Sequence, residues 1–149
     1  MTEPKASLSN ESRLIPSEEA MMALGAELAA RARPGVVLLL QGELGAGKTT
    51  LARGFLRALG YEGEVRSPTF NLLWLYETEP PVCHADLYRL DRPEQVEDLG
   101  LHEYFETHAV LVEWPERNFD AFPEDAIRVR IEVLSDGQRR VSIAGGKTS

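Results

Sequence analysis

The chain has 149 residues, 43% of them hydrophobic and 27% charged, which is the size and composition of one globular domain. Its net charge of −8 argues against direct binding to nucleic acid, because such binding relies on cations that neutralise phosphates. The single cysteine, Cys83, excludes an internal disulfide and a cysteine-based metal cluster. No apolar run approaches membrane-spanning length and the first residues lack the order of a secretory signal, so we expect a cytoplasmic protein without a membrane partner.

The N-terminal part of the chain predicts a helix after a polar start. Residues 1–12 are polar and show no period, so we expect them to be loose or to form an edge strand at most. Ser17 fits a helix N-cap, and Glu18 follows in the first turn, where the helix dipole favours anions. Apolar residues then recur on one helical face until Pro34-Gly35 ends the helix.

A buried strand and a second helix follow. Residues 36–40 are all apolar and include two β-branched valines, which favours a strand buried on both faces. After a glycine-rich stretch, Leu51, Phe55 and Leu59 fall four residues apart, as on one face of a helix, and Gly60 is placed to end it.

The rest of the chain alternates strands with short helices. The break at residues 79–81 is short enough to predict an antiparallel pair, and Asp136-Gly137 predicts a hairpin turn. The predicted strands cover residues 71–76, 82–88, 109–113, 127–133 and 140–143, and the predicted helices cover residues 93–99 and 101–105. We therefore predict one α/β domain over residues 1–149, with flexible ends at 1–12 and 145–149.

Residues 42–49 carry the strongest motif. They read Gly-Glu-Leu-Gly-Ala-Gly-Lys-Thr, which satisfies G-x-x-x-x-G-K-[ST] in full between a buried strand and a helix. In this motif the backbone N–H groups face an oxyanion, Lys48 reaches the outer phosphates and Thr49 offers its hydroxyl to Mg²⁺. A plain glycine-rich turn would not need Lys-Thr at the helix start. The nucleotide contacts are predicted at Leu44, Gly45, Ala46, Gly47, Lys48, Thr49 and Thr50.

The loop thus predicts an ATPase with the fold of a P-loop NTPase. We expect a three-layer α/β sandwich whose mixed sheet has a mainly parallel core and additional antiparallel strands. ATP and Mg²⁺ are the expected ligands.

An NTPase of this class needs a carboxylate at the end of another core strand to hold the Mg²⁺ shell. Glu113 ends the more apolar strand and Asp86 the weaker one. Acids at strand ends are also common as solvated residues. We assign Glu113 to the metal and Asp86 to hydrolysis or nucleotide sensing.

Several other residues allow two interpretations. Ser67-Pro68-Thr69 lies where such NTPases keep a nucleotide-sensing switch, although sequence physics alone favours a plain Ser-Pro turn there. His84 has no partner at metal-ligand spacing, which favours a structural hydrogen bond. Trp114 fits either core packing or a wall against nucleotide or partner, and Cys83 fits a small buried apolar residue.

Four motifs together resemble the TsaE (YjeE) family, the ATPase component of bacterial tRNA threonylcarbamoyladenosine synthesis. They are residues 42–50 (GELGAGKTT), 65–70 (VRSPTF), 84–90 (HADLYRL) and 113–116 (EWPE), in the family's order and spacing. The resemblance extends from about residue 14 to the C-terminal hairpin. Ala85 departs from it, since a bulkier apolar residue is more usual there.

The resemblance implies an ATPase that binds a complex of TsaB and TsaD. TsaD transfers a threonylcarbamoyl group to the adenosine beside the tRNA anticodon, and ATP hydrolysis resets the complex between turnovers. The protein would thus reach tRNA only indirectly, through the complex, which suits an acidic chain.

The resemblance also implies a role for each motif residue. Lys48, Asp86 and Glu113 would be catalytic, and Thr49 and Glu113 would hold the metal. Ser67, Pro68 and Thr69 would form the first switch. Trp114 would lie near the nucleotide or the partner, Glu18 would border the adenine, and His84 would help to position Asp86.

Two alternatives use the same loop. A small-molecule kinase would transfer the phosphoryl group to an acceptor, but no arginine-bearing lid is visible in the sequence. A non-catalytic nucleotide-gated binding module would bind ATP without needing to hydrolyse it.

Overall fold

Four parallel strands form the centre of the sheet, and antiparallel strands extend it on both sides. The computed structural model describes residues 8–65 and 72–145. Its seven strands follow the order β1-β7-β6-β2-β5-β4-β3, with parallel pairing from β6 through β2 and β5 to β4. The strands are β1 (Leu8–Ile15), β2 (Val37–Gln41), β3 (Leu73–Tyr76), β4 (Val82–Asp86), β5 (Ala109–Glu113), β6 (Ile127–Val133) and β7 (Arg139–Gly145).

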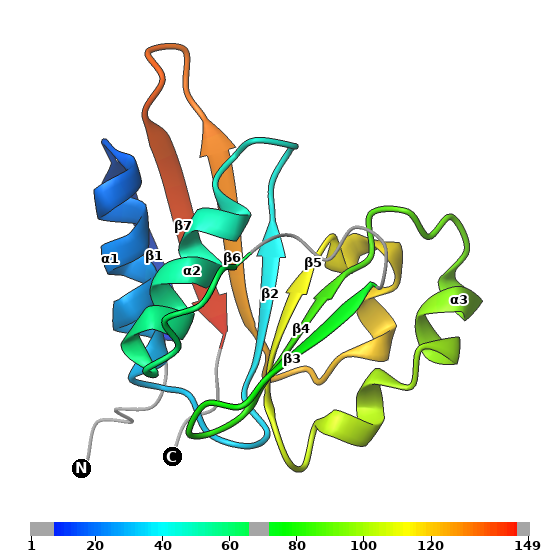
Figure 1. Cartoon of the computed structure of the whole chain (residues 1–149). Coiled ribbons are helices and arrows are strands. Elements are labelled where there is room, and N and C mark those ends of the chain that lie inside the picture. The colour runs from blue at the N-terminus through cyan, green and yellow to red at the C-terminus, as the bar shows by residue number, and fades with distance from the viewer. Residues whose placement is uncertain (1–7, 66–71, 146–149) are drawn as a thin grey trace, which may run out of the picture.

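Helices lie on both faces of this sheet, which makes three layers (Figure 1). The α-helices are α1 (Glu18–Ala29), α2 (Lys48–Ala58) and α3 (Pro93–Asp98), and the 3-10 helices are η1 (Leu101–Tyr104), η2 (Pro115–Arg117) and η3 (Phe119–Ala121). Within the described ranges, no helix combines the length and the apolar character needed to cross a membrane. The predicted fold class, a mainly parallel core with antiparallel additions, is confirmed.

Strand β2 supplies side chains to two separate cores because successive residues of a strand point to opposite faces. Leu38 and Leu40 pack into the core that contains α1 and α2. Val37 and Leu39 pack into the other, which contains α3 and residues of the 3-10 helices. The continuous apolar run therefore reflects burial on both faces, as predicted.

Two glycines bring α1 and α2 into close contact. A Cβ at Gly25 would lie 2.1 Å from the carbonyl oxygen of Leu51, and one at Gly54 would lie 2.1 Å from that of Met22. No side chain can occupy either space, so the two helix backbones touch. This contact fixes the start of α1 next to the start of α2, where the glycine-rich loop ends.

The structure settles several expectations about element boundaries. Residues 8–12 belong to β1, which pairs antiparallel with β7 at the edge of the sheet, as in the edge-strand alternative. The first helix ends at Ala29, before the predicted stop at Pro34-Gly35, and residues 30–35 form turns. The antiparallel pair is confirmed as β3–β4, and the C-terminal hairpin as β6–β7.

Gly25→Ala tests the helix contact. In an open helix this change would add about 1 kcal/mol of stability through helix propensity. Here we expect a loss of about 1–3 kcal/mol, as for other overpacked sites, because the methyl group overlaps the Leu51 carbonyl. Urea unfolding measures the change. Ala26→Ser, on the exposed face of α1, is the control and should stay within about 0.5 kcal/mol, and a raised midpoint for Gly25→Ala would contradict the argument.

Candidate functional site

Three parallel strands end at the same edge of the sheet and bring the predicted site residues together. Strand β2 leads into the glycine-rich loop, β4 ends at Asp86 and β5 ends at Glu113. Asp86 and Glu113 are register partners, and Glu113 is in turn the partner of Leu40. Ligands of open α/β sheets commonly bind at this carboxyl edge.

The loop turns sharply into α2 at Gly47. This residue has φ of +120°, a conformation that side chains rarely adopt, and a Cβ there would also approach the Met21 side chain at 3.1 Å. Helix α2 begins at the next residue, so its free N–H groups face the loop. Within the loop the Ala46 N–H donates to the Glu43 carbonyl at 3.0 Å. Lys48 Nζ donates to the carbonyl of Gly42, which holds its ammonium over the loop.

Lys48 is a buried cation beside buried carboxylates. Its exposed fraction is 5%, and those of Asp86 and Glu113 are 6% and 2%. Burial lowers the pKa of Lys48, while Glu113, Asp86 and Glu116 act in the opposite direction and favour its charged form. Lys48, Asp86 and Glu113 therefore form a compact charged cluster.

His84 holds Glu113 in place. Its Nε2 lies 2.8 Å from the Glu113 carboxylate, and neither side chain reaches solvent. The expected structural hydrogen bond is therefore present, and it joins His84 to Glu113, the register partner of Asp86. Strand β4 places His84 and Asp86 on one face, and the long histidine ring reaches diagonally to the neighbouring strand. Within the described part of the chain, His84 Nδ1 is buried without a hydrogen-bond partner.

The Asp86 carboxylate lies at the point where β4 turns away from the sheet. It accepts a hydrogen bond of 3.0 Å from the Tyr88 N–H. Arg117 donates to the Tyr88 carbonyl at 2.7 Å and so ties the segment after β4 to η2. The segment that follows Asp86 is thus bonded both to the Asp86 carboxylate and to η2.

Trp114 packs on the core, which is one of the two roles that the sequence left open, and its ring also contacts the loop lysine. It is half-buried against the second core, and its backbone has φ of +62°. Lys48 Nζ lies 3.9 Å from the centre of its ring, a cation–π contact, and the Tyr88 ring packs on it at 4.9 Å. The left-handed backbone turns the ring from the end of β5 toward the loop.

Two cavities flank the loop. The larger, about 390 Å³, is lined by eleven residues that include all the predicted loop contacts except Ala46: Leu44, Gly45, Gly47, Lys48, Thr49, Thr50, Asp86, Tyr88, Arg89, Glu113 and Trp114. The smaller, about 200 Å³, lies between the loop and the start of α1. Glu18, Ala46 and Thr50 line it together, so Glu18 lies beside the loop.

The larger cavity is lined by oxygen atoms that suit a cation. Thr49, Asp86 and Glu113 line it and carry oxygen atoms of the kind that Mg²⁺ prefers. Within residues 8–65 and 72–145, however, no group of three or more histidine, cysteine, aspartate or glutamate side chains could hold a metal alone. A bound phosphate would supply the missing oxygen ligands.

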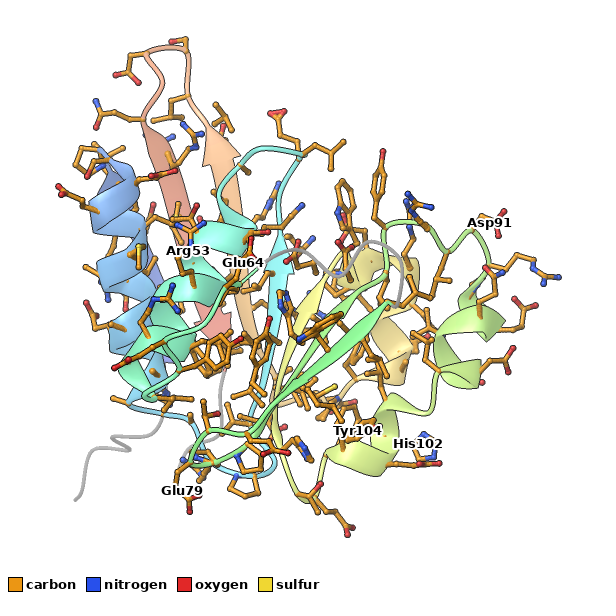
Figure 2. All side chains as sticks on the ribbon, in the orientation of Figure 1. Arg53, Glu64, Glu79, Asp91, His102 and Tyr104 are labelled. Atoms are coloured by element: carbon orange, nitrogen blue, oxygen red, sulfur yellow. The ribbon has the colours of Figure 1, made fainter. Side chains whose placement is uncertain are left out.

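Three further points complete the comparison with the sequence. Figure 2 shows His102 at the end of the sheet opposite the loop, and His108 precedes β5, so His84 is the histidine of this site. Ser67, Pro68 and Thr69 lie outside the described residues. Arg139 also contacts the loop, and no local signal in the sequence pointed to it.

A family model described as threonylcarbamoyl adenosine biosynthesis protein TsaE matches residues 15–141. The chain belongs to the TsaE family. A TsaE protein of Haemophilus influenzae is 38% identical over 137 residues, which cover 87% of each chain. A TsaE protein of Bacillus subtilis is 41% identical over 116 residues, 76% of this chain and 72% of the relative. Both are named tRNA threonylcarbamoyladenosine biosynthesis proteins.

A solved structure agrees with this TsaE assignment. The crystal structure of YdiB from Bacillus subtilis superposes with a TM-score of 0.80 at 33% identity, covering 93% of this chain and 87% of YdiB. The resemblance read from the four sequence motifs is thereby confirmed.

Trp114 fluorescence tests the Lys48 contact. In a Trp74→Phe variant Trp114 is the remaining tryptophan, and Mg²⁺-pyrophosphate should change its emission because the anion draws the Lys48 ammonium off the ring. Lys48→Met is the control and should show altered emission without ligand and no further change. Unaltered Trp114 emission, when calorimetry shows that the ligand binds, would contradict this arrangement.

Proposed function

We propose that this TsaE protein is an ATPase required for the threonylcarbamoyladenosine modification of tRNA, and that it acts by resetting a complex of TsaB and TsaD between turnovers. The observation that carries the ATPase part is the buried cluster at the end of the loop, in which Lys48 lies beside two strand-end carboxylates. In a purely structural turn, a buried and partly desolvated ammonium would cost free energy without any compensating role.

Phosphate recognition falls to the loop and the start of α2. The loop residues Gly45 and Gly47 present backbone N–H groups near the positive end of α2, where an anion is stabilised. Lys48 adds a full positive charge at the same place. When a phosphate binds, the Lys48 ammonium can exchange its bond to the Gly42 carbonyl for a phosphate oxygen.

The residues present fit a Mg²⁺ ion that arrives with ATP. The Thr49 hydroxyl and the Glu113 carboxylate face one cavity, and the bond from His84 orients Glu113. When bound, Mg²⁺ neutralises the charge on the outer phosphates. We assign Glu113 to the coordination shell of the metal and Thr49 to direct binding.

Hydrolysis needs a group that orients water, and Asp86 is the candidate. Its carboxylate lines the larger cavity and is fixed by the Tyr88 N–H. Such a fixed acceptor can hold a water molecule in line for attack. The Trp114 ring covers Lys48 and limits access of bulk water to the cluster. We place the adenine side of the nucleotide toward Glu18, in the smaller cavity.

The cellular role comes from the relatives, which are named for tRNA threonylcarbamoyladenosine biosynthesis. With a net charge of −8 this chain lacks the cations that direct tRNA binding relies on, which supports contact with tRNA only through the TsaB–TsaD complex. We place the protein in the cytoplasm with that complex. Ser67, Pro68 and Thr69 remain our candidates for the switch that reports the state of the nucleotide.

Removal of the loop lysine tests the ATPase assignment. We expect low intrinsic ATP hydrolysis by the wild-type protein and at least a hundredfold loss in Lys48→Ala, equal to about 2.7 kcal/mol of transition-state stabilisation. Phosphate release with Mg²⁺-ATP measures it. Arg130→Ala removes one exposed cation from β6 and is the charge-matched control, which should keep the wild-type rate.

The same assay separates the alternatives. Turnover that requires an added acceptor would indicate a small-molecule kinase, and Mg²⁺-ATP binding without hydrolysis, even with TsaB and TsaD, would indicate a nucleotide-gated binding module.

Reconstitution with TsaB, TsaD, tRNA and the threonylcarbamoyl adenylate tests the cellular role. We expect Asp86→Asn and Glu113→Gln to permit a first round of modification and to stop multiple turnover, because each keeps the shape of the side chain but loses its charge. Glu124→Gln, an exposed residue away from the loop, is the control for charge. Multiple turnover that is unchanged when this chain is omitted would refute the role.

A further inference from the structure

Arg139 contacts the phosphate loop from the far end of the chain. It is the first residue of β7, next to a hairpin turn that lies at the same end of the sheet as the loop (Figure 1). Its Nε donates to the Ala46 carbonyl at 2.9 Å and its Nη2 to the Gly45 carbonyl at 3.1 Å. Its Nη1 donates to the carbonyl of Gly137 within the hairpin, which anchors the guanidinium.

These bonds act on the two peptide groups that matter most to the loop. The carbonyl of Gly45 shares a planar trans peptide with the N–H of Ala46, and the carbonyl of Ala46 shares one with the N–H of Gly47. In such a peptide the C=O and the N–H point in opposite directions. A donor that holds both carbonyls from one side therefore turns the Gly47 N–H toward the other side. It also keeps the Ala46 N–H directed at the Glu43 carbonyl, to which that N–H donates at 3.0 Å within the loop.

An unassisted loop would not keep this orientation equally well. Gly45 has φ of +80° with open space around its Cα, and Gly47 has φ of +120°, so glycine backbones at both positions have freedom that other residues lack. The planar fork of an arginine bonds two carbonyls at once and holds them at a set spacing. Water could satisfy the same carbonyls, but it would not fix their direction.

We propose that Arg139 is a positioning residue for phosphate binding, which acts through the Gly45 and Ala46 carbonyls rather than by touching the nucleotide. The inference rests on the proposed function in one respect, namely that the loop binds phosphates. Arg139 also lines the smaller cavity beside Glu18, so a direct contact with the base or ribose is the competing role. The three hydrogen bonds from Arg139 to backbone carbonyls favour the indirect role.

The experiment compares Arg139→Gln with Arg140→Gln. Arg140 is the next residue on β7 and so points to the opposite face, where it lies 3.9 Å from Glu132. The two variants lose the same charge from the same strand. Calorimetry with Mg²⁺-ATP and with Mg²⁺-pyrophosphate, which has no base or ribose, measures the dissociation constants at a temperature well below unfolding.

We expect Arg139→Gln to weaken both ligands by the same factor, on the order of tenfold, the usual scale for loss of an orienting partner. Arg140→Gln should stay within about twofold, and Arg139→Lys, a single donor in place of a fork, should recover part of the loss. Thermal unfolding without ligand is recorded for each variant, because a purely structural role would lower stability and leave both affinities unchanged.

Three results would overturn the inference: weakening of ATP alone, unchanged affinity for both ligands, or an equal loss in Arg140→Gln. Wild-type protein that binds neither ligand would instead refute the phosphate site itself, and the inference with it. If only the Arg139 inference is overturned, and the wild-type protein binds both ligands, the proposed function is unaffected.

Discussion

The site depends on the burial of opposite charges at one edge of the sheet. An ammonium and two carboxylates, each at most 6% exposed, lie where three parallel strands end. Burying any one of them alone would cost several kcal/mol, but together they compensate one another. Burial lowers the pKa of Lys48 while the carboxylates favour its charged form, so the cluster keeps a cation ready to exchange protein oxygens for phosphate oxygens. The hydrogen bond from His84 to Glu113 also compensates for the burial of the Glu113 carboxylate.

Local signals were enough to predict much of this arrangement. The phosphate loop is a contiguous motif between an apolar strand and a helix, so its position and local conformation follow from neighbouring residues alone. Asp86 and Glu113 were recognised as strand ends because the apolar runs stop at them. That they lie side by side depends on the register of β4 against β5, and register is a property of the assembled sheet.

The features that sequence reasoning missed or misassigned are all long-range. Arg139 is separated from Ala46 by 93 residues, and no pattern within either segment indicates the other. His84 was expected to support Asp86, two residues away on its own strand, yet its ring reaches 29 residues ahead to Glu113. The close contact of Gly25 with Leu51 is also long-range. In the sequence, a glycine inside a helix indicates only a lower helix propensity, and its packing role is visible only once α2 lies against it.

An acidic chain can bind a polyphosphate because the two effects act over different distances. The net charge of −8 is spread over the whole molecule, and salt screens exposed charges beyond about 8–10 Å. The loop acts within hydrogen-bond distance, through backbone N–H groups, Lys48 and the start of α2. Its affinity for anions thus depends on how accurately those few groups are directed. The contacts that hold the loop from outside are those of Arg139 on one side and of the helix α1 on the other, and in our proposal they contribute to binding without reaching the ligand.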